Sequence, residues 1–350
     1  MRNLAANLLT LLVIGALVLL AVVGLARQQI TAKGPLVEPA RLMVERGARF
    51  GEVAEELEQL GAIRGLGPIS GATLLRLHAQ YTDRADDLKF GEYEIAPGAS
   101  IEDVVELLAT GSNVRYRITV PEGRTVAEIM RVLEEADFLT GEIEEVPEEG
   151  SLLPETYSAN RNDSRAEIIA RMQESMQQLL DEAWENRAPD LPLESKEDLL
   201  ILASIVEKEA RPGEHGRVAS VFTNRLRKGM LLQSDPTVIY GITLGQGPLG
   251  RGLRRSELDA NTPYNTYIRK GLPPTPIANP GRDAILATAN PDDTPYYYFV
   301  ADGTGGHAFA ETLVEHNRNV REWRRIEAEL ARQAKAAEAE GSGEKDTEQP

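Results

Sequence analysis

The sequence predicts an α+β protein with a single N-terminal membrane helix, a small α+β module and a larger C-terminal α+β domain. Three features support this prediction: an uncharged apolar run near the N-terminus, two stretches that each run strand, glycine turn and amphipathic helix, and a strongly apolar helix near residue 200. The chain has 350 residues, 42% of them hydrophobic, so it is long enough for about two domains with cores of their own.

The composition excludes several classes of function. The 55 acidic residues outnumber the 38 basic residues and give a formal net charge of −17, which is unfavourable for binding duplex DNA or another polyanion. The chain has no cysteine and only 4 histidines, so it has no disulfide or thiolate metal site, and a histidine-rich metal centre is not expected. We therefore expect no nucleic-acid partner, no metal and no cofactor.

Residues 8–26 form an uncharged apolar run that, as a helix, nearly crosses a hydrocarbon core. We predict a transmembrane helix here, preceded by a short tail at residues 1–7 and followed by a polar stem at 27–39 that contains glycine and prolines. A cleaved signal peptide is the alternative, because small residues at 24–26 suit a cleavage site, although the apolar run is longer than usual for one. Arg2 and the amino terminus precede the span, whereas four basic residues between 27 and 46 follow it, so charge bias alone does not orient the large domain.

Residues 40–113 look like a compact α+β module. The stretches 44–57 and 120–133 form a weak internal repeat, in which apolar residues recur at helical spacing after a glycine turn. Another helix is predicted from Ile101, with Ser100 as N-cap and Asp103 at the capping-box position. Units this small need partners to cover their apolar faces.

Residues 114–330 are predicted to form the second domain. An amphipathic helix follows Asp163, and a second long helix begins near Ser195 and is apolar from 199 to 206 except at Ser204. This second helix should be buried nearly all round and lie at the centre of the domain. Residues 233–310 are rich in glycine, proline and tyrosine, which predicts loops and short strands around it.

The last segment, residues 331–350, is a charged tail. Its apolar residues disappear after about Ala336, so it cannot form a core, and we expect it to be disordered.

Glu207 and Glu209 follow directly on the most apolar helix of the chain. Burial disfavours a charged carboxylate and can lift a glutamate pKa toward neutrality, which proton donation to a glycosidic oxygen requires. Residues two apart on a helix point roughly 200° apart, so the two carboxylates cannot face one cleft. Glu207 shares its face with Ala203 and Ser204, whose small side chains leave room for a sugar ring, and this favours Glu207. An exposed turn or ion pairing with Lys or Arg is the alternative.

Seven residues are candidate sugar contacts: Ser204, Gln233, Asp235, Thr237, Tyr240, Tyr264 and Asn265. Asp235 precedes Pro236, which favours extended backbone before it, so its carboxylate could orient a sugar hydroxyl. An Asp-Pro turn that bonds its own backbone is the simpler alternative. Tyr264 and Asn265 offer an aromatic face and an amide, although core or loop packing explains them equally well.

Eight segments between Val120 and Asn317 resemble, in order, those of the YceG-like endolytic murein transglycosylases. The segments are Val120–Gly123, Glu149–Tyr157, Leu202–Glu209, Val218–Leu226, Leu232–Tyr240, Tyr264–Tyr267, Gly271–Pro274 and Phe299–His307. That family has a short cytoplasmic N-terminus, one membrane helix, a LysM-like module and a catalytic domain. The resemblance implies that 40–113 is the LysM-like module and that 114–330 is the catalytic domain, on the periplasmic side of the inner membrane. The chain departs at Ser151 and Glu155, where the family often has an aromatic residue and an aspartate.

The resemblance also implies that Glu207 is the catalytic residue. It would protonate the oxygen leaving C4 of N-acetylglucosamine and then, as a base, help the C6 hydroxyl of N-acetylmuramic acid attack its own C1, giving a 1,6-anhydro end. Because the nucleophile belongs to the substrate, one glutamate suffices where most glycosidases use two carboxylates. The implied role is to cut nascent peptidoglycan strands and end their elongation, with penicillin-binding synthases as partners. A non-catalytic peptidoglycan-binding scaffold, or a hydrolase using Glu207, Asp235 and water, are the alternatives.

Overall fold

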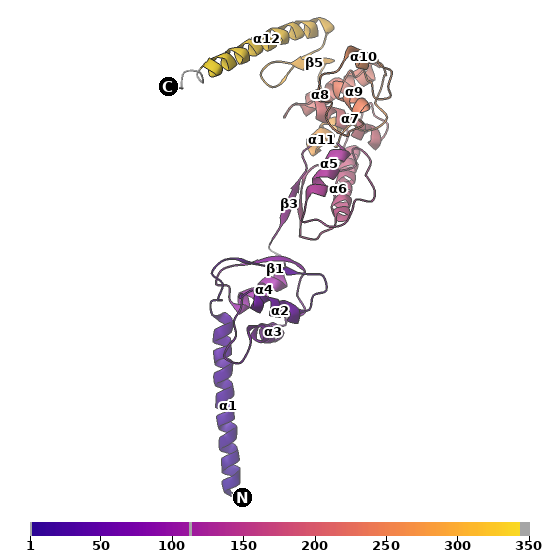
Figure 1. The fold of residues 1–350 in the computed structure, drawn as a ribbon. Helices are drawn as coiled ribbons and strands as arrows, with labels where there is room; N and C mark the ends of the chain where they lie inside the picture. Colours follow the sequence, from indigo (N-terminus) through magenta and orange to yellow (C-terminus); the bar gives the residue numbers. More distant parts are fainter. Residues whose placement is uncertain (1, 112–113, 344–350) are drawn as a thin grey trace. The chain divides into compact units, whose positions relative to one another are not determined.

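The computed structural model describes residues 2–111 and 114–343, and its internal contacts divide the chain into two units. The first unit holds the described residues up to Arg117 together with Phe138–Thr140 and Ser158–Asp163, and the second holds the others. Helices and short two-stranded sheets occur in the chain, which confirms the predicted α+β class (Figure 1). The two short segments that join the first unit come from beyond the predicted boundary at residue 113.

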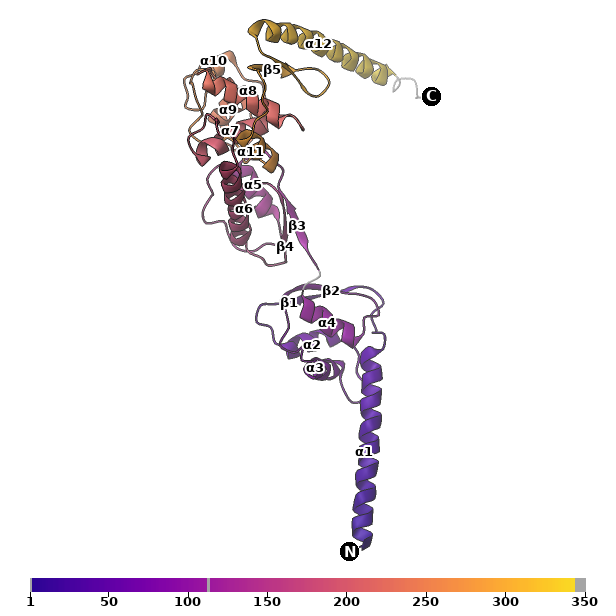
Figure 2. The ribbon, with the colours of Figure 1, turned by 180° about the vertical axis from the view of Figure 1, so that it is seen from behind.

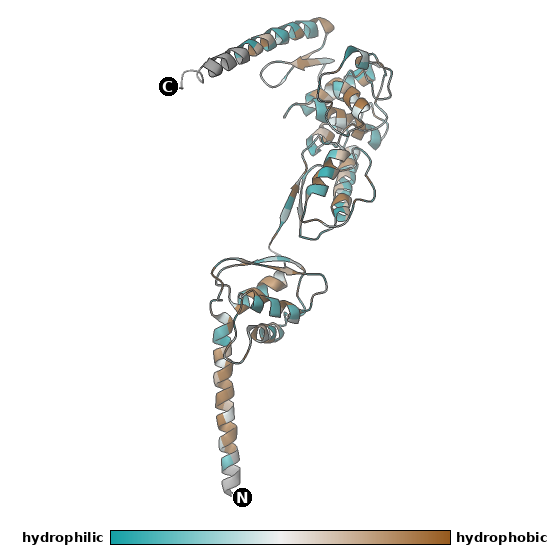
Figure 3. Ribbon diagram, viewed as in Figure 1, coloured by the Kyte–Doolittle hydropathy of each residue, from teal (hydrophilic) through white to brown (hydrophobic). Residues whose placement is uncertain are grey.

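The chain begins with α1 (Arg2–Thr31), a helix of 30 residues. Within it, Leu9–Thr31 is long and apolar enough to cross a membrane. The most apolar part of this segment is not buried against the rest of the protein. Figure 3 shows this segment as an almost continuous hydrophobic column. The helix continues beyond the predicted end at residue 26 because Arg and Gln are good helix formers and the first helix-breaking residue is Gly34. A signal sequence would meet the same criteria of length and composition.

In the first unit, β1 (Ala40–Val44) pairs antiparallel with β2 (Gly91–Ile95), which brings Leu42 opposite Tyr93. The helices of this unit are α2 (Phe50–Gln59), α3 (Gly71–Tyr81) and α4 (Ile101–Thr110). The predicted cap of α4 is confirmed, because the Ser100 hydroxyl accepts a hydrogen bond from the Asp103 N–H at 3.1 Å and the Asp103 carboxylate accepts one from the Ser100 N–H at 2.9 Å. The sequence analysis did not predict α3.

The strands β3 (Tyr116–Thr119) and β4 (Thr156–Ala159) pair with each other and contribute residues to both units. The second unit contains α5 (Val126–Glu135), α6 (Arg165–Glu185), α7 (Lys196–Glu209), α8 (His215–Arg227), α9 (Asp235–Thr243), α10 (Arg255–Leu258) and α11 (Arg282–Ala289). Helix α7 lies among α6, α8, α9 and α11, as both views show (Figures 1 and 2).

The predicted central helix is confirmed in α7. Leu199 and every residue from Ile201 to Val206 are buried, because the segment is apolar on all faces and must be covered on all of them. Its first turn is fixed by Ser195, whose hydroxyl accepts a hydrogen bond from the Asp198 N–H at 3.1 Å. This burial makes α7 the rigid element that carries the two glutamates at its end.

The chain closes with the hairpin β5 (Tyr298–Ala301) and β6 (His307–Ala310), followed by α12 (Leu313–Gly343), which packs against both strands. The structure corrects the expectation of a disordered tail from residue 331, since α12 continues to Gly343. Residues 331–340 consist almost entirely of Ala, Glu, Lys, Gln and Arg, which favour a helix even without a core. The rest of the expected tail, 344–350, lies outside the described residues.

Candidate active site

Glu207 lies in the last turn of α7 and is half-buried. Its Oε2 accepts a hydrogen bond from the Gly281 N–H at 3.0 Å. Gly281 is the N-cap of α11, where free N–H groups and the helix dipole favour a negative charge. The start of a second helix therefore fixes where the Glu207 carboxylate lies.

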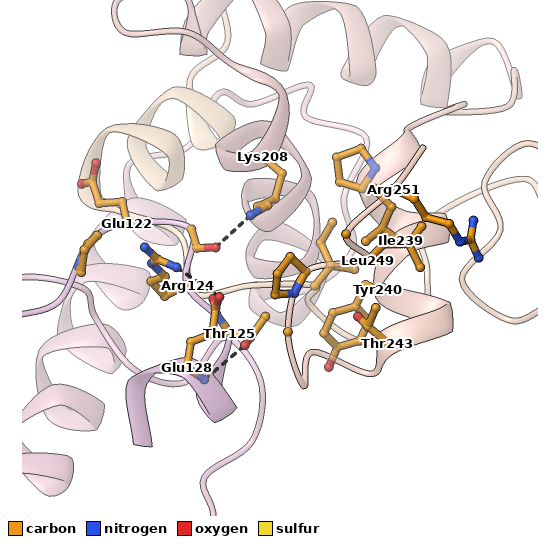
Figure 4. A pocket seen from close by; sticks show the side chains of 17 residues that line it. Glu122, Arg124, Thr125, Glu128, Lys208, Ile239, Tyr240, Thr243, Leu249 and Arg251 are labelled. Atoms are coloured by element: carbon orange, nitrogen blue, oxygen red, sulfur yellow. Dashed lines mark hydrogen bonds and ion pairs between the residues drawn. The ribbon is translucent and has the colours of Figure 1, made fainter. Parts of the chain in front are cut away.

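The turn that contains Gly123 packs directly against Glu207. A Cβ atom at Gly123 would lie 3.4 Å from the Glu207 Cγ, and the φ of +71° at this position favours glycine. Lys208 Nζ donates to the Gly123 carbonyl at 3.1 Å, which Figure 4 shows as a dashed line. The Gly123 N–H donates in turn to the Asn279 carbonyl at 3.0 Å. The turn is thus held between α7 and the segment that leads into α11.

The carboxylate of Glu122, like that of Glu207, lies against Gly281. A Cβ atom at Gly281 would lie only 1.9 Å from the Glu122 Oε1, so this carboxylate occupies the space that Gly281 leaves open. Partial burial, followed by the negative charges of Glu207 and Asp283, raises the pKa of Glu122. Two carboxyl groups from distant segments therefore meet at one glycine.

Asn279 and Glu149 hold the segments that carry Glu122 and Gly281 through hydrogen bonds. Asn279 is fully buried, and its Nδ2 donates to Glu149 Oε1 and to the Arg124 carbonyl, both at 3.0 Å. Glu149 also accepts hydrogen bonds from the Val126 N–H at 2.9 Å and from Tyr240 Oη at 3.2 Å. Burial raises the pKa of Glu149 even though these hydrogen bonds oppose the shift. The network holds the loop that carries Glu122 and the start of α5.

The sequence did not predict Asn279, Gly281 or the position of Glu122 beside Glu207. A signal was present, since Asn279-Pro280-Gly281 stands immediately before a helix and combines turn residues with an N-cap position. Glu122 was noted only as part of a repeated turn.

A pocket of about 530 Å³ opens beside this turn. Glu122 lies at one end of the residues drawn in Figure 4, and Tyr240, Thr243 and Arg251 lie toward the other. Its volume falls within the range of small-ligand sites. Tyr240 lines this cavity together with Gly123 and Lys208, whereas Glu207, which packs on Gly123, does not line it. Tyr264 does not line this pocket, but its ring packs on that of Tyr240 with centroids 5.1 Å apart.

Glu209 faces a different part of the unit. Its Oε1 accepts a hydrogen bond from Ser234 Oγ at 2.7 Å, and burial raises its pKa. It lines a second pocket of about 480 Å³, together with Gln233, Asp235 and Tyr267. The two glutamates of α7 therefore do not share one cleft, in agreement with the helical period.

The sequence predicts extended backbone at Asp235, before Pro236. The structure corrects this, because Asp235 is the first residue of the helix α9. A proline at the second helical position removes no helical hydrogen bond, so the helix begins before it. The Asp235 Oδ1 accepts a hydrogen bond from Tyr267 Oη at 2.7 Å. Gln233 is exposed and has a φ of +52°.

Three predicted sugar contacts lie in the interior: Ser204, Thr237 and Asn265 are each 0% exposed. Ser204 Oγ donates to the Ile201 carbonyl at 2.7 Å and accepts from the Ile277 N–H at 3.0 Å. Thr237 Oγ1 donates to the Ser234 carbonyl at 2.7 Å.

The Asn265 Nδ2 is within hydrogen-bond distance of the carbonyls of Glu257, Leu258 and Ala260, between 2.7 and 3.2 Å. These internal bonds make Asn265, like Ser204 and Thr237, part of the scaffold. The residue types alone could not reveal that their polar atoms face the protein.

The chain resembles proteins of one family over most of its length. Residues 42–322 match the YceG-like family. A Bacillus subtilis protein named endolytic murein transglycosylase is 30% identical in an alignment of 266 positions that covers 67% of this chain and 72% of that protein. A Streptococcus pneumoniae protein of the same name is 30% identical in an alignment of 330 positions that covers 80% of this chain and 57% of that protein. The crystal structure of a putative yceG-like protein from Listeria monocytogenes, 28% identical, aligns over 80% of this chain and 99% of its own with a TM-score of 0.48.

Proposed function

Because the chain belongs to the YceG-like family, we propose that it is an endolytic murein transglycosylase that cleaves the bond between N-acetylmuramic acid and N-acetylglucosamine within peptidoglycan strands. The names of the Bacillus and Streptococcus relatives support this activity. The product would carry a 1,6-anhydro end, and cleavage of nascent strands would end their elongation.

The position of Glu207 supports its assignment as the catalytic acid. Glu207 lies in the last turn of the largely buried helix α7, accepts a hydrogen bond from the Gly281 N–H and lies against the turn that borders the 530 Å³ pocket. A proton donor must be fixed in place and still reach substrate, and a half-buried carboxyl at the end of a rigid helix meets both needs. Glu207 would protonate the leaving oxygen, and the C6 hydroxyl of the muramic sugar would then attack C1.

The geometry gives less support to a water-using hydrolase built on Glu207 and Asp235. Asp235 lines the pocket that contains Glu209, whereas Glu207 packs against the turn of the other pocket. A general base for water must lie across the scissile bond from the acid. Asp235 therefore fits a sugar contact better than a catalytic base.

We also propose that Leu9–Thr31 anchors the protein in the inner membrane with the catalytic unit outside the cytoplasm. An extracytoplasmic domain suits an enzyme whose substrate is peptidoglycan. In this arrangement residues 40–113 act as a LysM-like module that binds glycan, and penicillin-binding synthases are the expected partners.

Mass spectrometry of uncrosslinked synthetic glycan strands, incubated with the full chain in detergent, tests the function. The proposal predicts fragments with anhydro ends from the wild type and none from Glu207→Gln. Hydrated reducing ends would indicate a hydrolase instead. Intact strands after incubation with folded wild-type protein that still binds them would indicate a non-catalytic scaffold.

A further inference from the structure

Glu122 and Glu207 are brought together by a single backbone position. Glu207 accepts the N–H of Gly281, and Glu122 fills the space where a side chain at Gly281 would stand. Glu122 is exposed in part and lines the 530 Å³ pocket. Among the described residues, no hydrogen bond or ion pair occupies its carboxylate. A carboxyl group placed beside the proposed acid and left without a protein partner is available to substrate.

We propose that Glu122 is a second catalytic residue, the base that removes the proton from the attacking sugar hydroxyl after Glu207, as the acid, has protonated the leaving oxygen. The inference rests on the proposed transglycosylase function and adds a second carboxylate to a reaction that one glutamate could perform alone.

The proposed step balances in atoms and charge. The bond between C1 of the muramic sugar and the leaving oxygen breaks, and that oxygen takes the proton of Glu207. A bond forms between C1 and the C6 oxygen of the same sugar, and the proton of that hydroxyl passes to Glu122. Glu207 ends as a carboxylate and Glu122 as a carboxylic acid, and transfer of one proton between these neighbours restores the starting state.

The surroundings of Glu122 bear on its strength as a base. A neighbouring negative charge disfavours ionisation of a carboxyl group. Partial burial and the charge of Glu207 raise the pKa of Glu122, so its carboxylate, when ionised, is a stronger base than an ordinary glutamate. The other charged groups that act on Glu122 are Asp283 and Glu155, which reinforce the shift, and His215, which opposes it.

The main test compares the full-length wild type with Glu122→Gln, Glu122→Asp and Glu122→Ala in the anhydro-product assay. Loss of a general base typically slows a reaction about 10²–10⁴-fold, so we expect a fall of this size in kcat for Glu122→Gln with little change in KM. We expect Glu122→Asp to recover part of the rate. The fall in wild-type rate at acid pH, where Glu122 becomes protonated, should be absent from the residual activity of Glu122→Gln.

Added formate separates a base from a structural role. Because Glu122 is exposed at the pocket, a small carboxylate can enter the space left by Glu122→Ala, and formate should raise the rate of that variant but not of the wild type or of Glu207→Gln. Glu135→Gln, which removes an exposed carboxylate at the end of α5, is the matched control and should behave as wild type.

Gly281→Ala gives an independent test. Its φ of −78° suits alanine, so the backbone N–H that binds Glu207 stays in place, while the new methyl group displaces the Glu122 carboxylate. We expect a loss of kcat that approaches that of Glu122→Gln.

The outcomes distinguish this inference from the function on which it rests. Absence of anhydro product from the wild type would overturn the transglycosylase itself. An active wild type, an inactive Glu207→Gln and a Glu122→Gln with unchanged kcat and pH profile would overturn only the role of Glu122. A slow Glu122→Ala that formate does not accelerate would also contradict the base.

Discussion

Glu207 and Glu209 are two residues apart on α7, yet their carboxylates bind to different parts of the unit. Glu207 accepts the Gly281 N–H at 3.0 Å, before α11, whereas Glu209 accepts the Ser234 hydroxyl at 2.7 Å, before α9. A helix turns about 100° per residue, so neighbours two apart point away from each other. The two glutamates can therefore be tested separately.

We expect the substitutions Glu207→Gln and Glu209→Gln to have different effects on catalysis. Removing a general acid lowers the rate by about 10²–10⁴-fold, which we expect for Glu207→Gln with unfolding temperature nearly unchanged. Glu209→Gln keeps the size of the side chain and can still accept the Ser234 hydroxyl, so it should retain most of the activity. Rates of anhydro-product formation by the two variants provide the measurement. An inactive Glu209→Gln beside an active Glu207→Gln would reverse the assignment.

Glu209 should make stability depend on pH. Burial raises its pKa in the folded protein, so the folded state binds this proton more tightly than the unfolded state does. The resulting stabilisation is complete below the ordinary carboxyl range and is lost as pH rises through the raised folded pKa. Melting temperatures measured across this range should fall with pH more steeply for the wild type than for Glu209→Gln, which has no proton to lose. Parallel curves for the two proteins would count against a raised folded-state pKa of Glu209.

Ser204→Ala should affect stability rather than catalysis. The substitution leaves the buried Ile277 N–H without its acceptor, and such a group typically costs about 1–3 kcal/mol. Denaturant titration should therefore show a lower free energy of unfolding, while kcat and KM, measured well below the transition, stay close to wild type. A raised KM with unchanged stability would instead indicate that the hydroxyl reaches the sugar.

The N-terminal helix should remain attached to the mature protein. A retained Leu9–Thr31 span predicts that a tag placed before residue 1 stays with the full-length chain in the membrane fraction after an alkaline wash. The catalytic unit should be accessible to protease in spheroplasts. Loss of the tag together with a soluble, shortened protein would show that the segment is a cleaved signal sequence.

Local patterns in the sequence predicted the elements of the fold that depend on neighbouring residues. The all-round apolar segment of α7 and the Ser100 cap of α4 are of this kind, because periodicity and capping act within a few residues. The opposite directions of Glu207 and Glu209 follow from the helical period alone.

Contacts between distant segments could not be predicted in this way. Asn279 bonds to Arg124 across 155 residues, and no local pattern shows which loop meets which turn. Ser204 looked like a neighbour of the sugar because the residue is small and polar. Its hydroxyl in fact bonds Ile201 and Ile277, and only the packing of other segments around α7 determines this.

The most direct test of the account is to run the cleavage reaction in water enriched in heavy oxygen and weigh the new glycan ends. Intramolecular attack uses an oxygen of the sugar itself. We therefore expect the wild type to form anhydro ends without heavy oxygen, and Glu207→Gln to form none. New reducing ends that carry heavy oxygen would mean that water is the nucleophile and would contradict the transglycosylase.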